Sequence, residues 1–451
     1  MTGWDAEVVT DATAGPSGAA LDVRGGVRAA YQPIVDLTTG EVVGYEALAR
    51  GQQHLEGLSP AQLFARARAA GCEADLDWEC KAAAFSGALT ARMPHRLALF
   101  VNAEPRWLSS PCPRHLQAVV DRATSRLQVV LEITERALVS DPAGLLAAVR
   151  RIRALGWGVA LDDVGAARES LALMPFIEPD VIKLDLRLTQ RNTDPEIAAI
   201  VNAVAAQAER TGATVLAEGI ETQEHLHRAL ALGATLGQGW MLGRPEPLPR
   251  KLPPPPTRDF AFTRADPPLL ATPFAAVEHG PGLRVAAKDL LLPMSQFLEA
   301  HPLSAPEPPI VLAAFEHARY FTPATAARYS GLADHCSFVA ALGTGIPCVP
   351  APGVRGADLP ADDALRGEWV VSVVGPHFAA ALLAKDLHTD RRDGQVPDRS
   401  RRFTFTVTHD RATVVHAARS LLARVGPLPE EPAPEGPQGQ ALSERSNPRP
   451  K

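Results

Sequence analysis

Strand-like and helix-like segments alternate from about residue 26 to residue 250, and this alternation limits the possible folds more than any other feature. In one unit, Asp141 is a suitable helix cap, Pro142 suits the first helical position, and Gly156 ends the helix. The strand-like run WGVALDD follows directly. About eight such strands fit in the segment, which predicts a parallel (β/α)8 TIM-like barrel. An open doubly wound sheet is the alternative, although no glycine-rich phosphate loop opens any of these helices.

Polar residues stand where the strand-like runs end. They are Glu46, Asn102, Glu132, Asp162, Asp163, Glu218 and Gln238, and Lys183 lies inside a similar run. A parallel barrel gathers its strand ends on one face, where barrel enzymes carry their active sites. Oxygen ligands that meet there suit hard divalent cations. Zinc is not expected, because no histidine falls at these strand ends.

Charge and composition exclude several classes of protein. The net charge of -6 argues against a general nucleic-acid coat, so we expect no DNA partner. The five cysteines are scattered and form no CxxC pair, as in a protein with reduced thiols. The acidic N-terminus lacks the apolar core of a signal peptide, and no stretch has the roughly 18 to 20 apolar residues of a membrane helix. We therefore expect a cytoplasmic protein without a membrane span.

Proline-rich stretches divide the chain into five parts. We expect a disordered leader (1–25), the barrel (26–250), a proline-rich linker (251–269), a smaller α+β or α/β domain (270–427) and a disordered tail (428–451). In the second domain, the runs 308–321, 368–375 and 401–410 are predicted strands, whereas 376–387 and 412–425 are predicted helices.

Seven motifs in the first half of the chain resemble EAL domains, the bacterial phosphodiesterases that open cyclic di-GMP. In order, they are YQPIVDLTTGEVVGYEALAR (31–50), VNAEPRWL (101–108), LEITERAL (131–138), ALDDVG (160–165), PDVIKLD (179–185), LAEGIET (216–222) and GQGWMLGRP (237–245). They follow the family's order across half of the chain. The resemblance implies an EAL-type barrel that binds cyclic di-GMP and two Mg²⁺ or Mn²⁺ ions.

The resemblance also implies a role for each matching position. Expected metal ligands are Glu46, Asn102, Glu132, Asp162, Asp163 and Glu218, with Asp163 on the second metal. Expected catalytic residues are Lys183, Glu218, Asp163 and Glu46, with Lys183 holding the attacking water. Expected substrate contacts are Gln32, Arg50, Asp185, Gln238 and Pro245, and expected supporting acids are Glu135 and Glu221. Taken singly, Glu132 and Glu135 are also compatible with surface charges at a helix start, and Glu46 with an ion pair to Arg50.

The loop after the acid pair departs from the family pattern. The family reads Asp-Asp-Phe-Gly-Thr-Gly-Tyr-Ser-Ser, whereas residues 162–170 here read DDVGAARES. The loss of a glycine and of the threonine hydroxyl removes backbone freedom and a hydrogen-bonding group. Three functions are therefore weighed. They are hydrolysis of cyclic di-GMP to pGpG, binding of cyclic di-GMP without cleavage, and a pure interaction scaffold. A homodimer through the barrel is expected in addition.

The second domain resembles the DICT domain, a presumed sensory module. The similarity rests on FEHARYFTPATAARYSGLA (315–333), WVVSVVGPHFAAALLAKDL (369–387) and RRFTFTVTHDRATVV (401–415). It implies that a sensory domain with an unidentified ligand controls the barrel. The histidines at 317, 335, 377 and 409 are interpreted as packed or surface residues rather than as a metal site.

Overall fold

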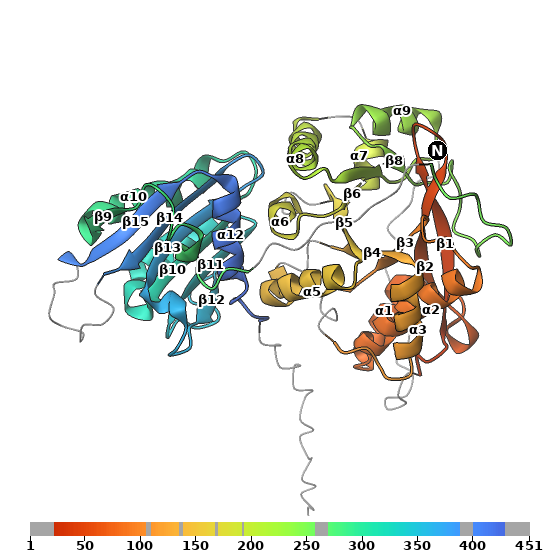
Figure 1. The fold of residues 1–451 in the computed structure, drawn as a ribbon, viewed down its shortest axis with the longest axis horizontal. Coiled ribbons are helices and arrows are strands. Elements are labelled where there is room, and N and C mark those ends of the chain that lie inside the picture. The colour runs from red at the N-terminus through yellow and green to blue at the C-terminus, as the bar shows by residue number, and fades with distance from the viewer. Residues whose placement is uncertain are drawn as a thin grey trace, which may run out of the picture.

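The computed structural model describes residues 22–104, 110–134, 139–166, 170–191, 194–257, 269–387 and 400–428. These residues form a closed eight-stranded barrel and a seven-stranded sheet with its own helices (Figure 1). The expected leader up to residue 21, the central part of the linker (258–268), the tail from 429 onward and Glu135 lie outside the described residues.

The barrel strands follow one another around the barrel in chain order. They are β1 (Val27–Asp36), β2 (Val42–Gly51), β3 (Ala98–Asn102), β4 (Gln128–Ile133), β5 (Gly158–Val164), β6 (Val181–Leu184), β7 (Thr214–Ala217) and β8 (Leu236–Gly237). The helices between them are α1 (Pro60–Ala69), α2 (Glu73–Thr90), α3 (Gln117–Arg126), α5 (Pro142–Ala154), α6 (Ser170–Ile177), α7 (Leu186–Gln190), α8 (Pro195–Thr211) and α9 (Gln223–Ala231). The predicted TIM-like barrel is confirmed.

Strand β1 corrects the prediction of an all-parallel barrel, because it runs antiparallel to both β2 and β8. The connection between β1 and β2 is a tight turn, in which the Asp36 carboxylate accepts hydrogen bonds from the backbone of Thr38 and Thr39. Gly40 follows with a φ of 74°. A parallel pair needs a crossover of a dozen or more residues, so this short turn permits only antiparallel pairing.

The predicted helix signals are found in the structure. The Asp141 carboxylate accepts a hydrogen bond from the backbone of Gly144 at 2.9 Å, and Pro142 occupies the first turn of α5. Asp194 caps α8 in the same way, at 2.8 Å from the backbone nitrogen of Ile197. These caps satisfy backbone donors that a helix start leaves without partners.

The second domain is built on a mixed sheet with the strand order β12-β11-β10-β13-β14-β15-β9. Its strands are β9 (Arg284–Ala287), β10 (Ile310–His317), β11 (Phe338–Thr344), β12 (Arg355–Asp358), β13 (Glu368–Val374), β14 (Ala379–Asp386) and β15 (Arg402–Thr408). Its α-helices are α10 (Lys288–Ala300), α11 (Pro323–Ala333) and α12 (Arg411–Leu422). Strands β10, β11 and β12 are parallel, and the other neighbours are antiparallel.

One prediction for this domain was wrong, because the segment 376–387 contains strand β14 and not a helix. Strand β14 is a central strand that pairs with β13 and β15, and its residues Ala379–Leu383 are buried. A strand covered on both faces has a continuous apolar sequence, which hydrophobic periodicity does not distinguish from a buried helix.

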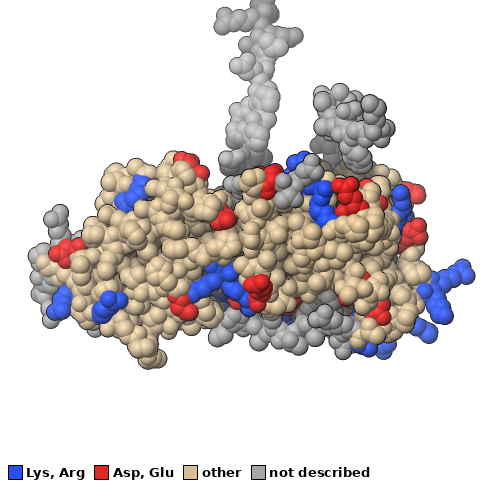
Figure 2. All heavy atoms as spheres, turned by 90° about the horizontal axis from the view of Figure 1, so that it is seen from above, with Lys and Arg blue, Asp and Glu red and all other residues tan. Residues whose placement is uncertain are grey.

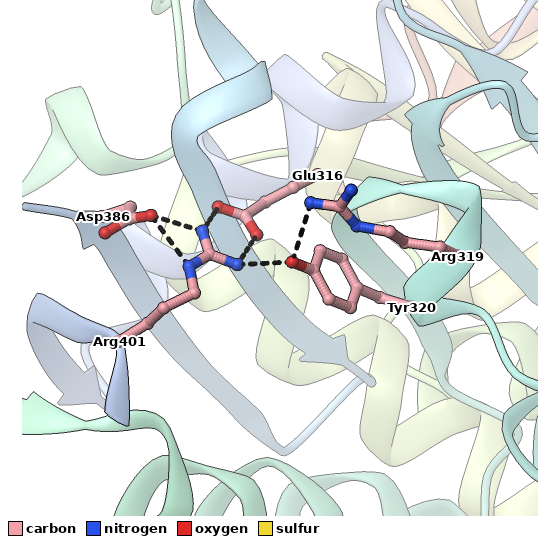
Figure 3. A network of polar contacts seen from close by, with 5 residues as sticks. All are labelled: Glu316, Arg319, Tyr320, Asp386 and Arg401. Carbon is pink, nitrogen blue, oxygen red and sulfur yellow. Dashed lines mark hydrogen bonds and ion pairs between the residues drawn. The ribbon is translucent and has the colours of Figure 1, made fainter. Parts of the chain in front are cut away.

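An ion network joins three segments of this domain (Figure 3). The Arg401 guanidinium donates to both carboxylate oxygens of Glu316, at 2.8 and 2.9 Å, and also pairs with Asp386. The Tyr320 hydroxyl accepts a further hydrogen bond from Arg401 at 2.8 Å. Glu316 has a φ of 56° where the register of β10 shifts against β11, so the network fixes a strained bulge.

Helix α12 lies on the side of the second sheet that faces the barrel (Figure 1). It contacts α5 and α6, and its buried residues Val414, Ala418 and Leu421 belong to one hydrophobic cluster with Leu145 and Leu146 of α5. The two domains are therefore joined by a continuous apolar core.

Charged side chains of both signs are mixed on the surface drawn in Figure 2. Lys and Arg side chains form small separate groups on the face drawn in Figure 2 and alternate there with Asp and Glu. Among the described helices, none combines the length and the apolar character required to cross a bilayer.

Candidate active site

The two-residue period of the barrel strands brings the predicted polar residues to one end of the barrel. In strands β3 to β8, an apolar residue of the barrel interior precedes each polar residue by two positions. The pairs are Phe100 and Asn102, Val130 and Glu132, Ala160 and Asp162, Val181 and Lys183, Leu216 and Glu218, and Leu236 and Gln238. Side chains two residues apart share a face of a strand, so every polar residue points inward just above the apolar layer.

Lys183 is the centre of this group. Its ammonium nitrogen lies 2.7 Å from Glu132 Oε1, 2.8 Å from Asp162 Oδ1 and 2.9 Å from Glu218 Oε1. The side chain is 1% exposed. All three contacts are ion pairs, and Glu132 Oε1 and Asp162 Oδ1 receive no hydrogen bond of suitable geometry from a described donor.

Glu46 lies beside this group and is held by two amides. Its carboxylate accepts hydrogen bonds from Asn102 Nδ2 at 3.1 Å and from Gln238 Nε2 at 2.6 Å, and lies 3.9 Å from Lys183 Nζ. Gln238 also donates to Gln32 Oε1 at 3.1 Å, and Gln32 donates to the carbonyl of Gly243 at 3.0 Å. The alternative that Glu46 pairs with Arg50 finds no support, because these partners take its carboxylate instead.

Asp163 reaches the site through a bulge. Strict alternation along β5 would point it away from Asp162, but Asp163 has a φ of 55° and the register between β5 and β6 shifts here. A bulge changes the direction of a side chain in this way. One carboxylate oxygen from each of Asp162, Asp163 and Glu218 lies within 4.8 Å of the others, a spacing that suits a metal ion.

Excess negative charge dominates the electrostatics of the site. Burial and the Glu46 carboxylate raise the pKa of Glu132 well above its usual value, and burial raises the pKa of Glu218 to about 8. Burial and Asp162 likewise raise the pKa of Asp163. Burial alone would lower the pKa of Lys183, but Asp162, Glu132 and Glu218 outweigh it and raise this pKa. The carboxylates thus lack sufficient positive charge nearby.

These residues fit divalent cations, as the resemblance to EAL domains implies. Glu132 Oε2 and Gln238 Oε1 are buried, and no described donor forms a hydrogen bond with either. Buried oxygen atoms without a donor are unfavourable unless a cation occupies the space between them. When all five carboxylates are ionised, the single ammonium leaves an excess of negative charge that divalent cations would offset. The oxygen-rich set suits Mg²⁺ or Mn²⁺.

Four other predicted residues have their described contacts outside the cluster. Arg50 is half-buried on β2 and donates to the carbonyl of Ala49. Asp185 caps α7 and pairs with Arg187 at 2.8 Å, and Pro245 lies in the segment that bridges back to β1. Glu221 is exposed, and its carboxylate forms no ion pair with a described residue. The roles predicted for these four residues stay predictions.

A cavity of about 360 Å³ opens beside the cluster. Glu46, Asn102 and Glu132 form its polar wall, and Phe64 of α1 and Leu48 are part of its apolar wall. Sequence reasoning did not include α1 and α2 in the site, although Phe64, Asp77 and Cys80 line this cavity. The buried pair of Asp77 and Lys81 is visible in the sequence only as opposite charges four residues apart, which usually indicates a surface pair.

Comparisons with known proteins agree with this geometry. Residues 19–245 match the EAL domain family, and residues 273–387 match the sensory domain in diguanylate cyclases and two-component systems, DICT. The cyclic di-GMP phosphodiesterase RocR of Pseudomonas aeruginosa is 32% identical over 239 residues, which are 50% of this chain and 58% of RocR. The cyclic di-GMP phosphodiesterase PA2567 of the same organism is 32% identical over 238 residues, or 52% of this chain and 40% of PA2567. The chain thus spans about half the length of these curated relatives.

Two solved structures of similar proteins are complexes with cyclic di-GMP, and one of them also contains manganese. A manganese and cyclic di-GMP complex of BlrP1 from Klebsiella pneumoniae is 31% identical, with a TM-score of 0.44, and covers 49% of this chain and 56% of its own. The PaMucR phosphodiesterase complex with cyclic di-GMP is 26% identical, with a TM-score of 0.43, and covers 50% of this chain and 93% of its own. Because the EAL match extends over half of the sequence and includes every residue of the carboxylate cluster, the chain belongs to the EAL domain family.

Proposed function

We propose that the barrel hydrolyses cyclic di-GMP to linear pGpG with two Mg²⁺ or Mn²⁺ ions. The observation that carries the proposal is the buried carboxylate cluster around Lys183, beside a cavity with an apolar wall. RocR and PA2567, which are each 32% identical to the matched half of this chain, are named cyclic di-GMP phosphodiesterases.

The proposed metal ligands are the residues already predicted: Glu46, Asn102, Glu132, Asp162, Asp163 and Glu218. Two bound cations would lower the pKa of a water molecule and stabilise the charge that grows on phosphorus. Asn102 and Gln238 hold Glu46 in place through their amide groups. Glu132 is buried on a rigid strand, so its direction changes little when a ligand binds.

Lys183 is proposed to hold the attacking water. Its raised pKa keeps it protonated, so it acts as a hydrogen-bond donor and not as a base. Its ammonium now forms ion pairs with three carboxylates. With divalent cations bound to these carboxylates, Lys183 would be able to orient a water molecule through an N–H group.

The substrate is proposed to lie between the cluster and the cavity. Gln32, Arg50, Asp185, Gln238 and Pro245 are the proposed substrate contacts, with Glu135 and Glu221 as supporting acids. The cavity walls combine an apolar side chain, Phe64, with the polar groups of Glu46 and Asn102. This combination suits a flat base next to a charged phosphodiester.

Regulation by the DICT domain and assembly into a homodimer complete the proposal. The contact of α12 with α5 and α6 supports control of the barrel by the sensory domain. Since α12 covers these two helices, a homodimer through the barrel would use other barrel helices. A monomer in light scattering at micromolar concentration would exclude the dimer.

The test is an assay of the purified full chain with cyclic di-GMP and either Mg²⁺ or Mn²⁺, with pGpG measured by chromatography. We expect pGpG with either metal and none with excess EDTA. Calorimetric binding of cyclic di-GMP without any product would refute hydrolysis and favour the receptor.

A further inference from the structure

Helix α6 joins the two strands that carry the centre of the site. Strand β5 contributes Asp162 and Asp163, and β6 contributes Lys183. The chain passes from Asp163 through the altered loop into α6 and returns to β6 through Glu178, which has a φ of 43°. The position of α6 therefore affects both the segment that follows Asp163 and the segment that enters β6.

The C-terminal end of α6 is held by side chains from three other helices. Arg419 Nη1 of α12 donates to the carbonyl of Phe176 at 2.8 Å. Arg153 Nη2 of α5 donates to the carbonyls of Ile177 and Glu178, both at 2.7 Å. Gln207 Nε2 of α8 lies 3.5 Å from the carbonyl of Met174. The last carbonyls of a helix lack intrahelical partners and carry partial negative charge, so guanidinium groups bind well there.

Arg419 differs from the other two because it comes from the sensory domain. Arg419 is 2% exposed, so water does not replace the carbonyl of Phe176 if the contact breaks. A buried charged donor that loses its acceptor is strongly unfavourable. Nearby, Val415 and Leu422 of α12 belong to the hydrophobic cluster that includes α5 and α6. The contact is thus an integral part of the domain interface.

We propose that Arg419 is a positioning residue for the Asp162, Asp163 and Glu218 group, because it fixes the end of α6 from the sensory domain. This inference rests on the proposed metal site and identifies how the sensory domain acts on it. A ligand that displaces α12 would release Phe176 and loosen α6, which begins seven residues after Asp163. Asp163 is the sensitive member of the group, since its direction depends on a single left-handed residue in a bulge.

The interface supplies a matched control. Arg355 of β12 in the sensory domain donates to the carbonyl of Val139, which precedes α5 in the barrel domain. This contact also joins a guanidinium to a backbone carbonyl across the two domains, and the described contacts of Arg355 do not involve α6. Arg355→Gln therefore weakens the interface without releasing the end of α6.

The test measures Mn²⁺ binding to the full chain by electron paramagnetic resonance of free Mn²⁺, independently of hydrolysis. The Mn²⁺-binding step that Asp163→Asn weakens is assigned to the group that contains Asp163. We expect Arg419→Gln to raise the dissociation constant of that step about fivefold, since substitutions along a coupling network change affinities by this order. The dissociation constant of Arg419→Lys, which keeps a cationic donor, should fall between those of the wild type and Arg419→Gln, and Arg355→Gln should match the wild type. Circular dichroism checks that each variant is folded.

The inference is overturned if folded Arg419→Gln binds Mn²⁺ as the wild type does, or if Arg355→Gln weakens the same step equally. If Arg419→Gln does not fold, the test uses Arg419→Lys, and Mn²⁺ binding like that of the wild type then overturns the inference. A different experimental outcome would refute the proposed function. A wild-type protein that binds Mn²⁺ and produces no pGpG would refute hydrolysis and leave the role of Arg419 intact.

Discussion

Replacing Lys183 with methionine tests whether the carboxylate cluster is organised around a missing positive charge. The substitution keeps an unbranched side chain and removes the ammonium that lies within 2.9 Å of Glu132, Asp162 and Glu218. Removing one partner of a buried ion pair destabilises a protein by about 3–5 kcal/mol. Since Lys183 is 1% exposed, solvent screening does not reduce this value much.

The expected loss of stability depends on metal. For a domain of the barrel's size, about 3–5 kcal/mol lowers the unfolding temperature by roughly 6–20 °C in EDTA. Mn²⁺ supplies the positive charge that methionine lacks. A free Mn²⁺ concentration of about 100 times the dissociation constant stabilises the folded protein by about 2.7 kcal/mol. Mn²⁺ should therefore raise the unfolding temperature of Lys183→Met more than that of the wild type. Thermal unfolding followed by tryptophan fluorescence and circular dichroism measures both values.

A second buried lysine provides the control. Lys81 is 3% exposed and pairs with Asp77 outside the cluster. Lys81→Met should lose similar stability with and without Mn²⁺. The reasoning is refuted if Lys183→Met in EDTA unfolds within about 2 °C of the wild type. An equal effect of Mn²⁺ on the Lys183 and Lys81 variants would also refute it.

Four further substitutions test other parts of the structure. Asp163→Asn should reduce pGpG formation by about a hundredfold or more, because misplacement of a reacting group near 1 Å has this effect, while calorimetry with Ca²⁺ should still detect cyclic di-GMP binding. Gly239→Ala should abolish activity or folding in the same assay, because a Cβ there would lie 2.2 Å from a backbone oxygen of Ile220. Arg401→Met should destabilise the sensory domain by about 3–5 kcal/mol in urea unfolding, because two buried carboxylates lose their partner, and the exposed Arg402→Met should change little. Burial raises the pKa of Glu299 above its ordinary 4.5, so the stability that this residue contributes below pH 4.5 is lost as the pH rises through the raised pKa. Glu299→Gln should accordingly unfold at a temperature that varies less between pH 4 and pH 7 than that of the wild type.

The sequence predicted the barrel and its polar cluster because both depend on local patterns. The alternation of strand and helix signals identified the barrel, and the period of two residues carried Asn102, Glu132 and Asp162 to the same end. These features depend only on neighbours along the chain. Family motifs added the order of the ligands, which spacing alone does not provide.

The features that were missed depend on pairing between distant segments. The antiparallel direction of β1 follows from a short turn, whose conformation the apolar pattern does not encode. The strand β14 has the composition of a helix and becomes a strand because β13 and β15 flank it. The bulge at Asp163 and the contact of Arg419 with Phe176 require the assembled structure. Periodicity describes a single segment, so it does not predict such contacts.

The position of α12 near the end of the chain has a consequence for biosynthesis. The ribosome completes α5 and α6 first, yet the apolar faces of these helices are covered only after α12 emerges. Roughly 230 residues separate the two events, which corresponds to about 10–50 s at the usual speed of translation. During this interval the nascent barrel presents an unprotected apolar surface, so chaperone binding should be strongest on chains that stop before residue 411.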